Sequence, residues 1–281
     1  MRSPEIRPGT QETGLLSQTN TTADQPVLQC KTVERRFGGL LALNGVDMQI
    51  GRGEIFGLVG PNGSGKTTLT NAITGFYPPQ RGQVLLHGND ITGLAPHKVA
   101  RLGVARTFQN LALFNGMTVL DNILLGRHVH MKTGVLRTAL YWFLSLKDEI
   151  AHRQVVEEVI DFLQLESVRS ELVDAIPIGL KKRVELARAL VAEPTLRILD
   201  EPMAGMNQEE KEYMARFILD ARDERGITVL LIEHHMDIIT GICDRMLVLS
   251  YGQVIQSGIP KDVIADPRVI KAYLGGAHAA A

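Results

Sequence analysis

The sequence predicts a mixed α/β fold into which a helical subdomain is inserted. Short apolar segments typical of buried strands, at residues 54–59, 196–199 and 228–232, alternate with amphipathic helices in the first and last thirds of the chain. Residues 118–173 instead contain few strand-forming patterns and many helix formers. The length of 281 residues is long for one domain and short for two, which fits a single domain that carries an insertion.

Each element follows from a local pattern. Gly51 and Gly53 favour a turn between the second and third strands, and the apolar residues within 69–76 recur at the spacing of one helical face. Gly75 lies near the end of that helix, and the prolines at 78–79 prevent its continuation. Arg197 is unusual inside an apolar strand, and we expect it at the strand's exposed end. The expected strands are 27–37, 46–50, 54–59, 84–86, 196–199, 228–232, 246–249 and 254–255, and the expected helices are 69–76, 149–165, 181–192 and 209–225.

Composition excludes several classes of protein. The 30 basic and 31 acidic residues give a net charge of −1, so no overall basic field favours a nucleic-acid partner. Two cysteines, Cys30 and Cys243, can form neither a disulfide framework nor a multi-cysteine zinc site. No apolar run reaches the roughly 18 residues that a membrane-spanning helix needs. Residues 1–26 are polar and lack the apolar region of a signal peptide, so they predict a flexible tail, as do residues 279–281.

A phosphate-binding motif gives the first indication of chemistry. The sequence G-P-N-G-S-G-K-T follows an expected strand and precedes an expected helix, and it matches the pattern G-x-x-x-x-G-K-[ST]. The glycines let backbone N–H groups turn toward phosphate oxygens, and the helix N-terminus adds a partial positive charge. Lys66 would reach the β- and γ-phosphates and Thr67 would bind Mg²⁺. The pattern indicates a P-loop ATPase (RecA-like) core that binds ATP and Mg²⁺ through Gly60, Pro61, Asn62, Gly63, Ser64, Gly65, Lys66, Thr67 and Thr68.

Two acidic residues at the end of a later strand supply candidates for metal binding and catalysis. Asp200 follows the apolar strand at 196–199, where a carboxylate would hold Mg²⁺ through water. Glu201 is then placed to polarise a water for attack on the γ-phosphorus. Such a pair could also simply end a strand, but the P-loop upstream favours the catalytic interpretation.

With these motifs in order, residues 27–275 resemble the ATP-binding subunit of an ABC transporter. The sequence R-T-F-Q-N matches the family's Q-loop, so the resemblance implies that Gln109 binds Mg²⁺ and senses a membrane subunit. The sequence A-G-M-N matches the D-loop, which crosses a dimer interface, and implies a nucleotide contact for Asn207. Phe37 precedes the P-loop by 23 residues, where the family stacks an aromatic ring on adenine. His234 matches the switch histidine that contacts the γ-phosphate.

The signature motif of that family is altered here. The family form is L-S-G-G-Q, whereas this chain has I-P-I-G-L at 176–180, so that Gly179 is the one glycine kept. Pro177 stands where a serine hydroxyl would bond the partner's γ-phosphate, and proline has neither a hydroxyl nor an N–H. A variant with Pro, Gly and Leu occurs in related importer subunits. The resemblance therefore implies that the change is tolerated and that Gly179 lies at the partner's nucleotide.

Within the family, the chain most resembles the branched-chain amino acid uptake subunits. The resemblance rests on F-G-G-L at 37–40, on the insert after N-I-L-L-G-R at 122–127 and on A-Y-L-G at 272–275. It implies an ATPase domain over 27–278 with a helical insertion at about 110–192. It also implies a second ATPase subunit (identical or paralogous), membrane permease subunits, an indirect solute-binding protein, and a peripheral position on the cytoplasmic face of the inner membrane. An ABC ATPase of another transport system, for another solute or for lipid export, and a P-loop small-molecule kinase remain open alternatives.

Overall fold

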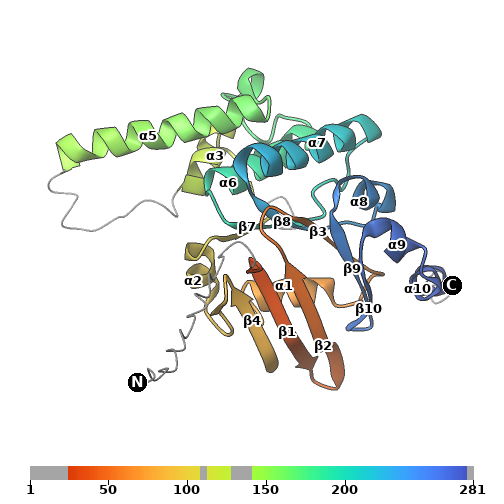
Figure 1. Cartoon of the computed structure of the whole chain (residues 1–281). Coiled ribbons are helices and arrows are strands. Elements are labelled where there is room, and N and C mark those ends of the chain that lie inside the picture. The colour runs from red at the N-terminus through yellow and green to blue at the C-terminus, as the bar shows by residue number, and fades with distance from the viewer. Residues whose placement is uncertain (1–24, 108–112, 128–140, 277–281) are drawn as a thin grey trace, which may run out of the picture.

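The computed structural model describes residues 25–107, 113–127 and 141–276, which form two β-sheets with helices between and above them (Figure 1). The strands are β1 (Leu28–Phe37), β2 (Leu40–Ile50), β3 (Ile55–Val59), β4 (Arg81–Leu86), β5 (Asn89–Asp90), β6 (Val104–Arg106), β7 (Leu196–Asp200), β8 (Thr228–Ile232), β9 (Arg245–Ser250) and β10 (Gln253–Gly258). The α-helices are α1 (Lys66–Ile73), α2 (Pro96–Arg101), α3 (Val119–Gly126), α5 (Tyr141–Phe162), α6 (Ile178–Val191), α7 (Gln208–Arg225), α8 (Met236–Ile242), α9 (Pro260–Ile264) and α10 (Pro267–Gly276), and the 3₁₀ helix η3 spans Glu166–Val168.

The two sheets differ in strand direction. The first is antiparallel, in the order β2-β1-β4-β5. The second has the order β10-β9-β3-β8-β7-β6, in which β9 through β6 run parallel and β10 pairs antiparallel with β9. Every residue of β3, β7 and β8 is buried, as expected for central parallel strands covered on both faces. The mixed α/β fold class with an antiparallel subdomain is confirmed.

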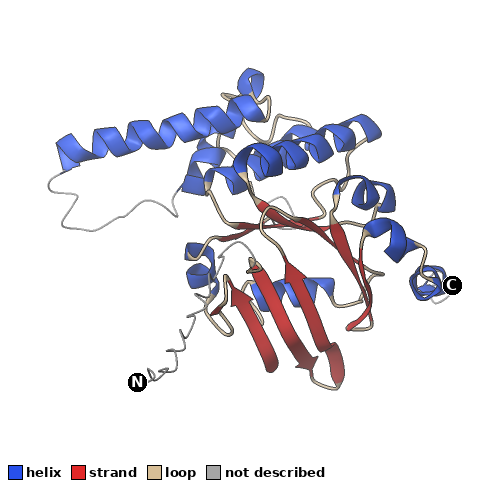
Figure 2. Ribbon diagram, in the orientation of Figure 1, coloured by secondary structure: helices blue, strands red, loops and turns tan. Residues whose placement is uncertain are grey.

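Two hydrophobic cores lie on the two faces of the parallel sheet. In β3, Phe56 and Leu58 face the core shared with α1 and the antiparallel sheet, whereas Ile55 and Val59 face the core shared with the helical layer. Figure 2 shows this layering, with the larger group of helices on one side of the parallel sheet. Because β3 is held from both faces, the loop that follows Val59 starts from a fixed point.

The helical insertion lies between β6 and β7 and contains α3, α5, η3 and α6. Helix α5 begins at Tyr141, whereas the sequence predicted a start at residue 149. The prediction missed residues 141–148 because they lack the amphipathic period by which a helix is identified. Val156, Val159 and Ile160 of α5 pack into the core of the helical layer. Among the described residues, none of the helices combines the length and apolar character that a membrane crossing requires. The predicted tails at 1–26 and 279–281 lie almost wholly outside the described residues.

The prediction for Arg197 was wrong. This side chain is 1 % exposed on β7, which is paired with β6 on one side and β8 on the other. Its Nη2 atom donates to the Leu190 carbonyl at 3.1 Å, at the C-terminal end of α6, where a cation is favoured by the helix dipole. Burial, and secondarily the charge of Arg225, lower the pKa of Arg197 to about 9. The sequence around Arg197 contains no sign of this contact, because the helix end that holds it belongs to another element.

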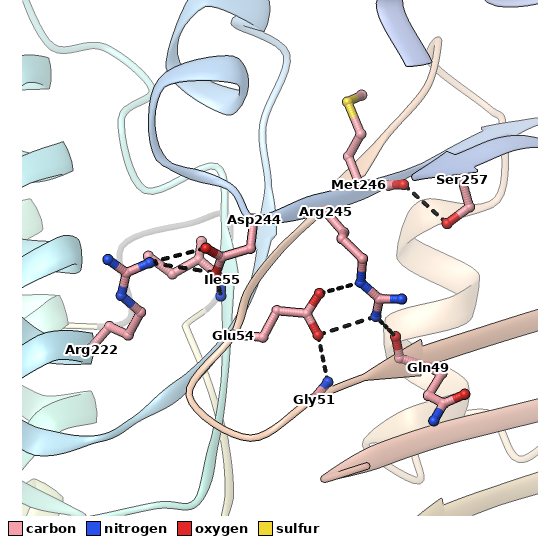
Figure 3. Close-up of polar contacts among 9 residues, drawn as sticks. All are labelled: Gln49, Gly51, Glu54, Ile55, Arg222, Asp244, Arg245, Met246 and Ser257. Carbon is pink, nitrogen blue, oxygen red and sulfur yellow. Dashed lines mark hydrogen bonds and ion pairs between the residues drawn. The ribbon is translucent and has the colours of Figure 1, made fainter. Parts of the chain in front are cut away.

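A polar cluster fixes the start of β3, at the end opposite the P-loop (Figure 3). The Arg245 guanidinium bonds Glu54, with Nε 2.6 Å from Oε1, and donates from Nη2 to the Gln49 carbonyl at 2.7 Å. The Asp244 carboxylate accepts the Ile55 N–H at 2.8 Å. These bonds join β2 of the antiparallel sheet to β3 and β9 of the parallel sheet. They therefore fix the position of one sheet relative to the other.

Candidate active site

The loop between β3 and α1 requires glycine at both ends. Gly60 has φ +149, and a Cβ there would overlap the Leu249 carbonyl oxygen. Gly65 is the N-cap of α1 with φ +110, and a Cβ there would lie 2.8 Å from the Ala42 carbonyl oxygen. Neighbouring backbone therefore encloses the loop on both sides, so that its shape is set before any phosphate binds.

The start of α1 is available to an anion. Gly65 provides no side-chain cap, and the first turn contains no acidic residue, so its backbone N–H groups and helix dipole have no internal counter-charge. The Lys66 ammonium curls back over the loop and donates to the Gly60 carbonyl at 2.7 Å and to the Pro61 carbonyl at 3.1 Å. Burial lowers the pKa of Lys66, which the negative charges of Glu201 and Asp200 oppose. The predicted phosphate-binding cation therefore lies near the predicted carboxylates.

The predicted metal ligands are only partly described. Thr67 is exposed on the first turn of α1, and Asp200 lies 6 % exposed at the end of β7. Gln109 lies outside the described residues. Within the described part of the chain, no group of three His, Cys, Asp or Glu side chains could hold a metal alone. A hydroxyl and a carboxylate suit Mg²⁺, since this ion prefers oxygen ligands and usually shares its shell with phosphates and water.

The two predicted catalytic residues meet at the end of the parallel sheet. The Nε2 atom of His234 lies 2.7 Å from Oε1 of Glu201, and both side chains are partly exposed. Glu201 has φ +50, a left-handed conformation that is strained for a residue with a side chain. Its N–H donates to the Ile232 carbonyl at 2.9 Å, which fixes this conformation against β8. The geometry can hold a water-activating carboxylate next to an imidazole.

A third carboxylate in this region was not identified from the sequence. Glu233 is 2 % exposed, and its two oxygens accept the N–H groups of Met203 at 3.1 Å and of His234 at 3.2 Å. Burial raises the pKa of Glu233. Its position directly after an apolar strand, as for Asp200, was the available signal. Glu233 therefore links the backbone of Met203, just before the predicted D-loop, to the backbone of His234.

The signature loop and the D-loop lie side by side in one chain. Gly179 is buried in the first turn of α6, and a Cβ there would overlap the Glu210 carboxylate. Glu210 and Asn207 form a capping box at the start of α7, with both hydrogen bonds at 2.9 Å. The Asn207 side chain thus caps a helix, and its nucleotide contact stays a prediction. Pro177 is the N-cap of α6 and supplies no side-chain bond.

The candidate adenine-stacking residue is held by two neighbours that sequence reasoning missed. Phe37 is 39 % exposed at the end of β1. The Tyr77 ring stands edge-on to it, with centroids 5.5 Å apart and an interplanar angle of 84°. The Arg35 guanidinium carbon lies 4.9 Å from the Phe37 centroid, and Nη1 donates to the Pro78 carbonyl at 2.7 Å. Edge-on aromatic contact and a cation over the ring both stabilise this orientation.

A groove of about 420 Å³ lies between the core and the helical insertion. Its walls come from α2, β6, α3, α6 and the segment after α1. Burial lowers the pKa of Arg188, against the effect of the nearby Glu185 charge. The groove therefore combines apolar walls with buried charge. Its lining includes Phe76, His97, Arg106, Leu125, Glu185 and Arg188.

Comparison with protein families decides the class. The family model for the ABC transporter matches residues 43–204, which include the P-loop, the signature helix and Asp200. The chain belongs to the ABC transporter family. A model described as branched-chain amino acid ATP-binding cassette transporter also matches residues 253–279 of this ABC cassette. The family binds ATP and hydrolyses it to power transport, and it implies membrane permeases as partners.

Curated relatives match the ABC cassette along nearly its whole length. It is 38 % identical over 253 residues to the high-affinity branched-chain amino acid transport ATP-binding protein BraF of Pseudomonas aeruginosa, covering 90 % of this chain and 99 % of the relative. It is also 38 % identical over 260 residues to LivG of Escherichia coli, which carries the same description and is covered to 99 %.

Solved structures confirm the fold. The ADP conformation of an ATP-binding cassette of an ABC transporter superposes with a TM-score of 0.78 and 32 % sequence identity, covering 89 % of this chain and 99 % of that one. A nucleotide-free ATP-binding cassette gives a TM-score of 0.77, also at 32 % identity and with the same coverage. The predicted P-loop ATPase core is therefore the fold of this ABC cassette.

Proposed function

We propose that this chain is the ATP-hydrolysing motor subunit of an importer for branched-chain amino acids or similar small polar solutes. ATP hydrolysis is supported mainly by one observation, the 2.7 Å contact between Glu201 and His234 near the Lys66 ammonium. The solute class is supported by the names of BraF and LivG, which match 90 % of the chain at 38 % identity.

In this proposal each side chain has a distinct task. Lys66 and the N–H groups at the start of α1 bind the β- and γ-phosphates, and Phe37 stacks on adenine. Thr67, Gln109 and Asp200 hold Mg²⁺, which supplies positive charge against the phosphate oxygens when it is bound. Glu201 accepts a proton from the attacking water, and His234 contacts the γ-phosphate while Glu201 orients its ring.

The proposed active form contains two chains. The first turn of α6 carries backbone N–H groups that lack partners within the helix, and Pro177 does not cap them. This turn belongs to the same face as the D-loop, since Ile178 lies 3.9 Å from where a Cβ of Gly205 would be. A head-to-tail pair about a two-fold axis brings this face against the partner's P-loop, so that Gly179 approaches the partner's ATP.

The groove is the proposed docking site for a membrane permease. It lies between the two parts of the chain that ATP would move against each other, and residues 106–107 in its lining lead directly into the segment containing Gln109. Its apolar walls, the buried Glu185 and the partly buried Arg188 suit a short amphipathic helix. We place the subunit on the cytoplasmic face of the inner membrane, coupled indirectly to a solute-binding protein.

Transport in proteoliposomes tests this function. The chain would be reconstituted with candidate permease and solute-binding proteins, and uptake of labelled leucine, isoleucine and valine would be followed with ATP inside or outside. Uptake should require ATP on the side of this subunit and should stop in the Glu201→Gln variant. ATP-dependent uptake of other solutes with none of these three would refute the solute assignment. ATP consumption that requires a phosphate-accepting small molecule would identify a kinase.

A further inference from the structure

One guanidinium joins the metal-binding strand to the helix of the P-loop. The Nη2 atom of Arg106 lies 2.7 Å from Oδ2 of Asp200, and its Nη1 atom donates to the Asn71 side-chain oxygen at 2.6 Å. The side chains of the ion pair are each 8 % exposed. Asn71 belongs to α1, so Arg106 fixes the carboxylate relative to the helix that begins at the phosphate site.

The next residue binds the backbone of the same strand. The Thr107 N–H donates to the Ile198 carbonyl at 2.9 Å, and the Asp200 N–H donates to the Thr107 hydroxyl at 3.2 Å. Arg106, the last residue of β6, thus holds the side chain of Asp200, and Thr107, the residue after β6, holds its backbone. These are the last two described residues before the segment that contains Gln109.

The arrangement leaves one of the two Asp200 carboxylate oxygens available to a metal ion. Oδ2 is taken by Arg106, whereas no residue in the described part of the chain forms a hydrogen bond to Oδ1. Because the guanidinium is planar and its Nη1 atom is held by Asn71, its Nη2 atom offers Oδ2 a fixed bonding position, which the ammonium of a lysine could not provide. A buried ion pair contributes little net stability, because desolvation offsets most of the attraction, so this geometry needs another explanation.

We propose that Arg106 is a positioning residue for Mg²⁺: it binds Oδ2 of Asp200 and turns Oδ1 toward the ion that arrives with ATP. Because Arg106 also lines the groove and leads into the Gln109 segment, it connects the groove to the metal carboxylate. This inference rests on the proposed function, since it takes Asp200 to be the carboxylate that serves the metal.

The test measures how much Mg²⁺ strengthens ATP binding. Equilibrium titration of the full chain with ATP, in the Glu201→Gln background to prevent hydrolysis, gives a dissociation constant in excess Mg²⁺ and another in EDTA. The dissociation constant in EDTA divided by that in Mg²⁺ is the factor by which Mg²⁺ strengthens ATP binding, and we call this ratio the Mg²⁺ contribution. Arg106→Lys keeps a positive charge beside Asp200, so the fold should be retained. The lysine cannot bond Asp200 and Asn71 at the same time, so the bridge between them is lost. Loss of such a supporting contact typically reduces metal affinity about 10–100-fold. The ratio should therefore fall by about tenfold or more, with the EDTA value little changed.

Three further variants make the outcome specific. Asn71→Ala keeps the ion pair and frees one end of the guanidinium, so the ratio should fall by less than in Arg106→Lys. Asp200→Asn should lose the Mg²⁺ contribution, and adding Arg106→Lys to it should change nothing further. Arg216→Lys, at a side chain that is 78 % exposed on α7, is the matched control and should behave as the background protein.

The possible failures are distinct. If the background protein shows no Mg²⁺ contribution, or if Asp200→Asn retains it, the proposed function of Asp200 fails. If that contribution exists and depends on Asp200 but is unchanged or larger in Arg106→Lys, the positioning role of Arg106 is refuted. A larger ratio would mean that Arg106 competes with the metal for the carboxylate.

Discussion

His234 and Glu201 lie 33 residues apart in the sequence, yet their side chains approach to 2.7 Å between Nε2 and Oε1. The contact follows from the sheet, because β7 and β8 are parallel neighbours with Asp200 opposite Ile232. The residues after both strands therefore emerge at the same edge, where ligands bind in open α/β sheets. The backbone of Glu201 is strained at this edge, with φ +50, and its side chain contacts His234 there.

A first prediction concerns Gly179. An added methyl would displace the Glu210 carboxylate and break its bond to the Asn207 N–H, and losing a helix cap typically costs about 1 kcal/mol. Gly179→Ala should therefore lower the free energy of unfolding more in the natural sequence than in a Glu210→Ala background, by about 1 kcal/mol. Urea denaturation of the two single variants and the double variant measures this coupling. Equal effects of Gly179→Ala in both backgrounds would show that Gly179 does not press on Glu210.

A second prediction concerns the N-cap of α6. A serine at position 177 can accept an N–H of the first helical turn and also donate its own proton to a phosphate oxygen. Pro177→Ser should be more stable to urea than Pro177→Ala by about 1 kcal/mol, since both remove the proline ring and differ in the hydroxyl.

The same pair of variants tests the partner contact of the signature loop. In the Glu201→Gln background, analytical ultracentrifugation should detect dimers at a lower ATP concentration for Pro177→Ser than for Pro177→Ala. If both dimerise at the same ATP concentration while the stability difference is present, residue 177 caps α6 but does not reach the partner's nucleotide.

A third prediction concerns the buried Arg197. Its Nε and Nη1 atoms have no hydrogen-bond partner within the described residues, whereas the Leu190 carbonyl also accepts the Glu193 N–H. Arg197→Met should therefore raise the free energy of unfolding at neutral pH by about 1–4 kcal/mol, because replacing a poorly paired buried charge by an apolar side chain is typically stabilising to that extent. Arg216→Met on the exposed face of α7 should have little effect.

The advantage of Arg197→Met should depend on pH. The pKa of Arg197 is lowered in the folded chain, to about 9, so the folded state disfavours the charged form. The penalty is fully present below that value and declines as the pH rises from about 9 toward the higher pKa of the unfolded chain. Urea denaturation of both proteins at pH 7.5 and at pH 10 should give a smaller difference at the higher pH. A variant less stable than the natural sequence at pH 7.5 would contradict this account.

Local sequence patterns predicted much of the fold and part of the site. The P-loop is recognisable because it needs glycines at a fixed spacing between a strand and a helix, and the carboxylates because they end apolar strands. By contrast, the contacts of Arg106 with Asn71 and Asp200 join residues that are 35 and 94 positions apart. Neither a spacing nor a period connects them, so only the folded chain reveals them. Residues 89–90, which lie in none of the expected strands, form β5 because β4 provides a paired edge.

In the proposed function, Glu201 activates the water that cleaves ATP. Phosphate release at saturating ATP and Mg²⁺, measured on the same samples as ATP binding, tests it most directly in the natural chain and in Glu201→Gln. The amide keeps the shape of the side chain but cannot accept the proton. Turnover should fall by about 10²–10⁴-fold while ATP still binds, and the ATP-bound dimer should accumulate. Undiminished phosphate release by a variant that binds ATP normally would show that another residue is the base.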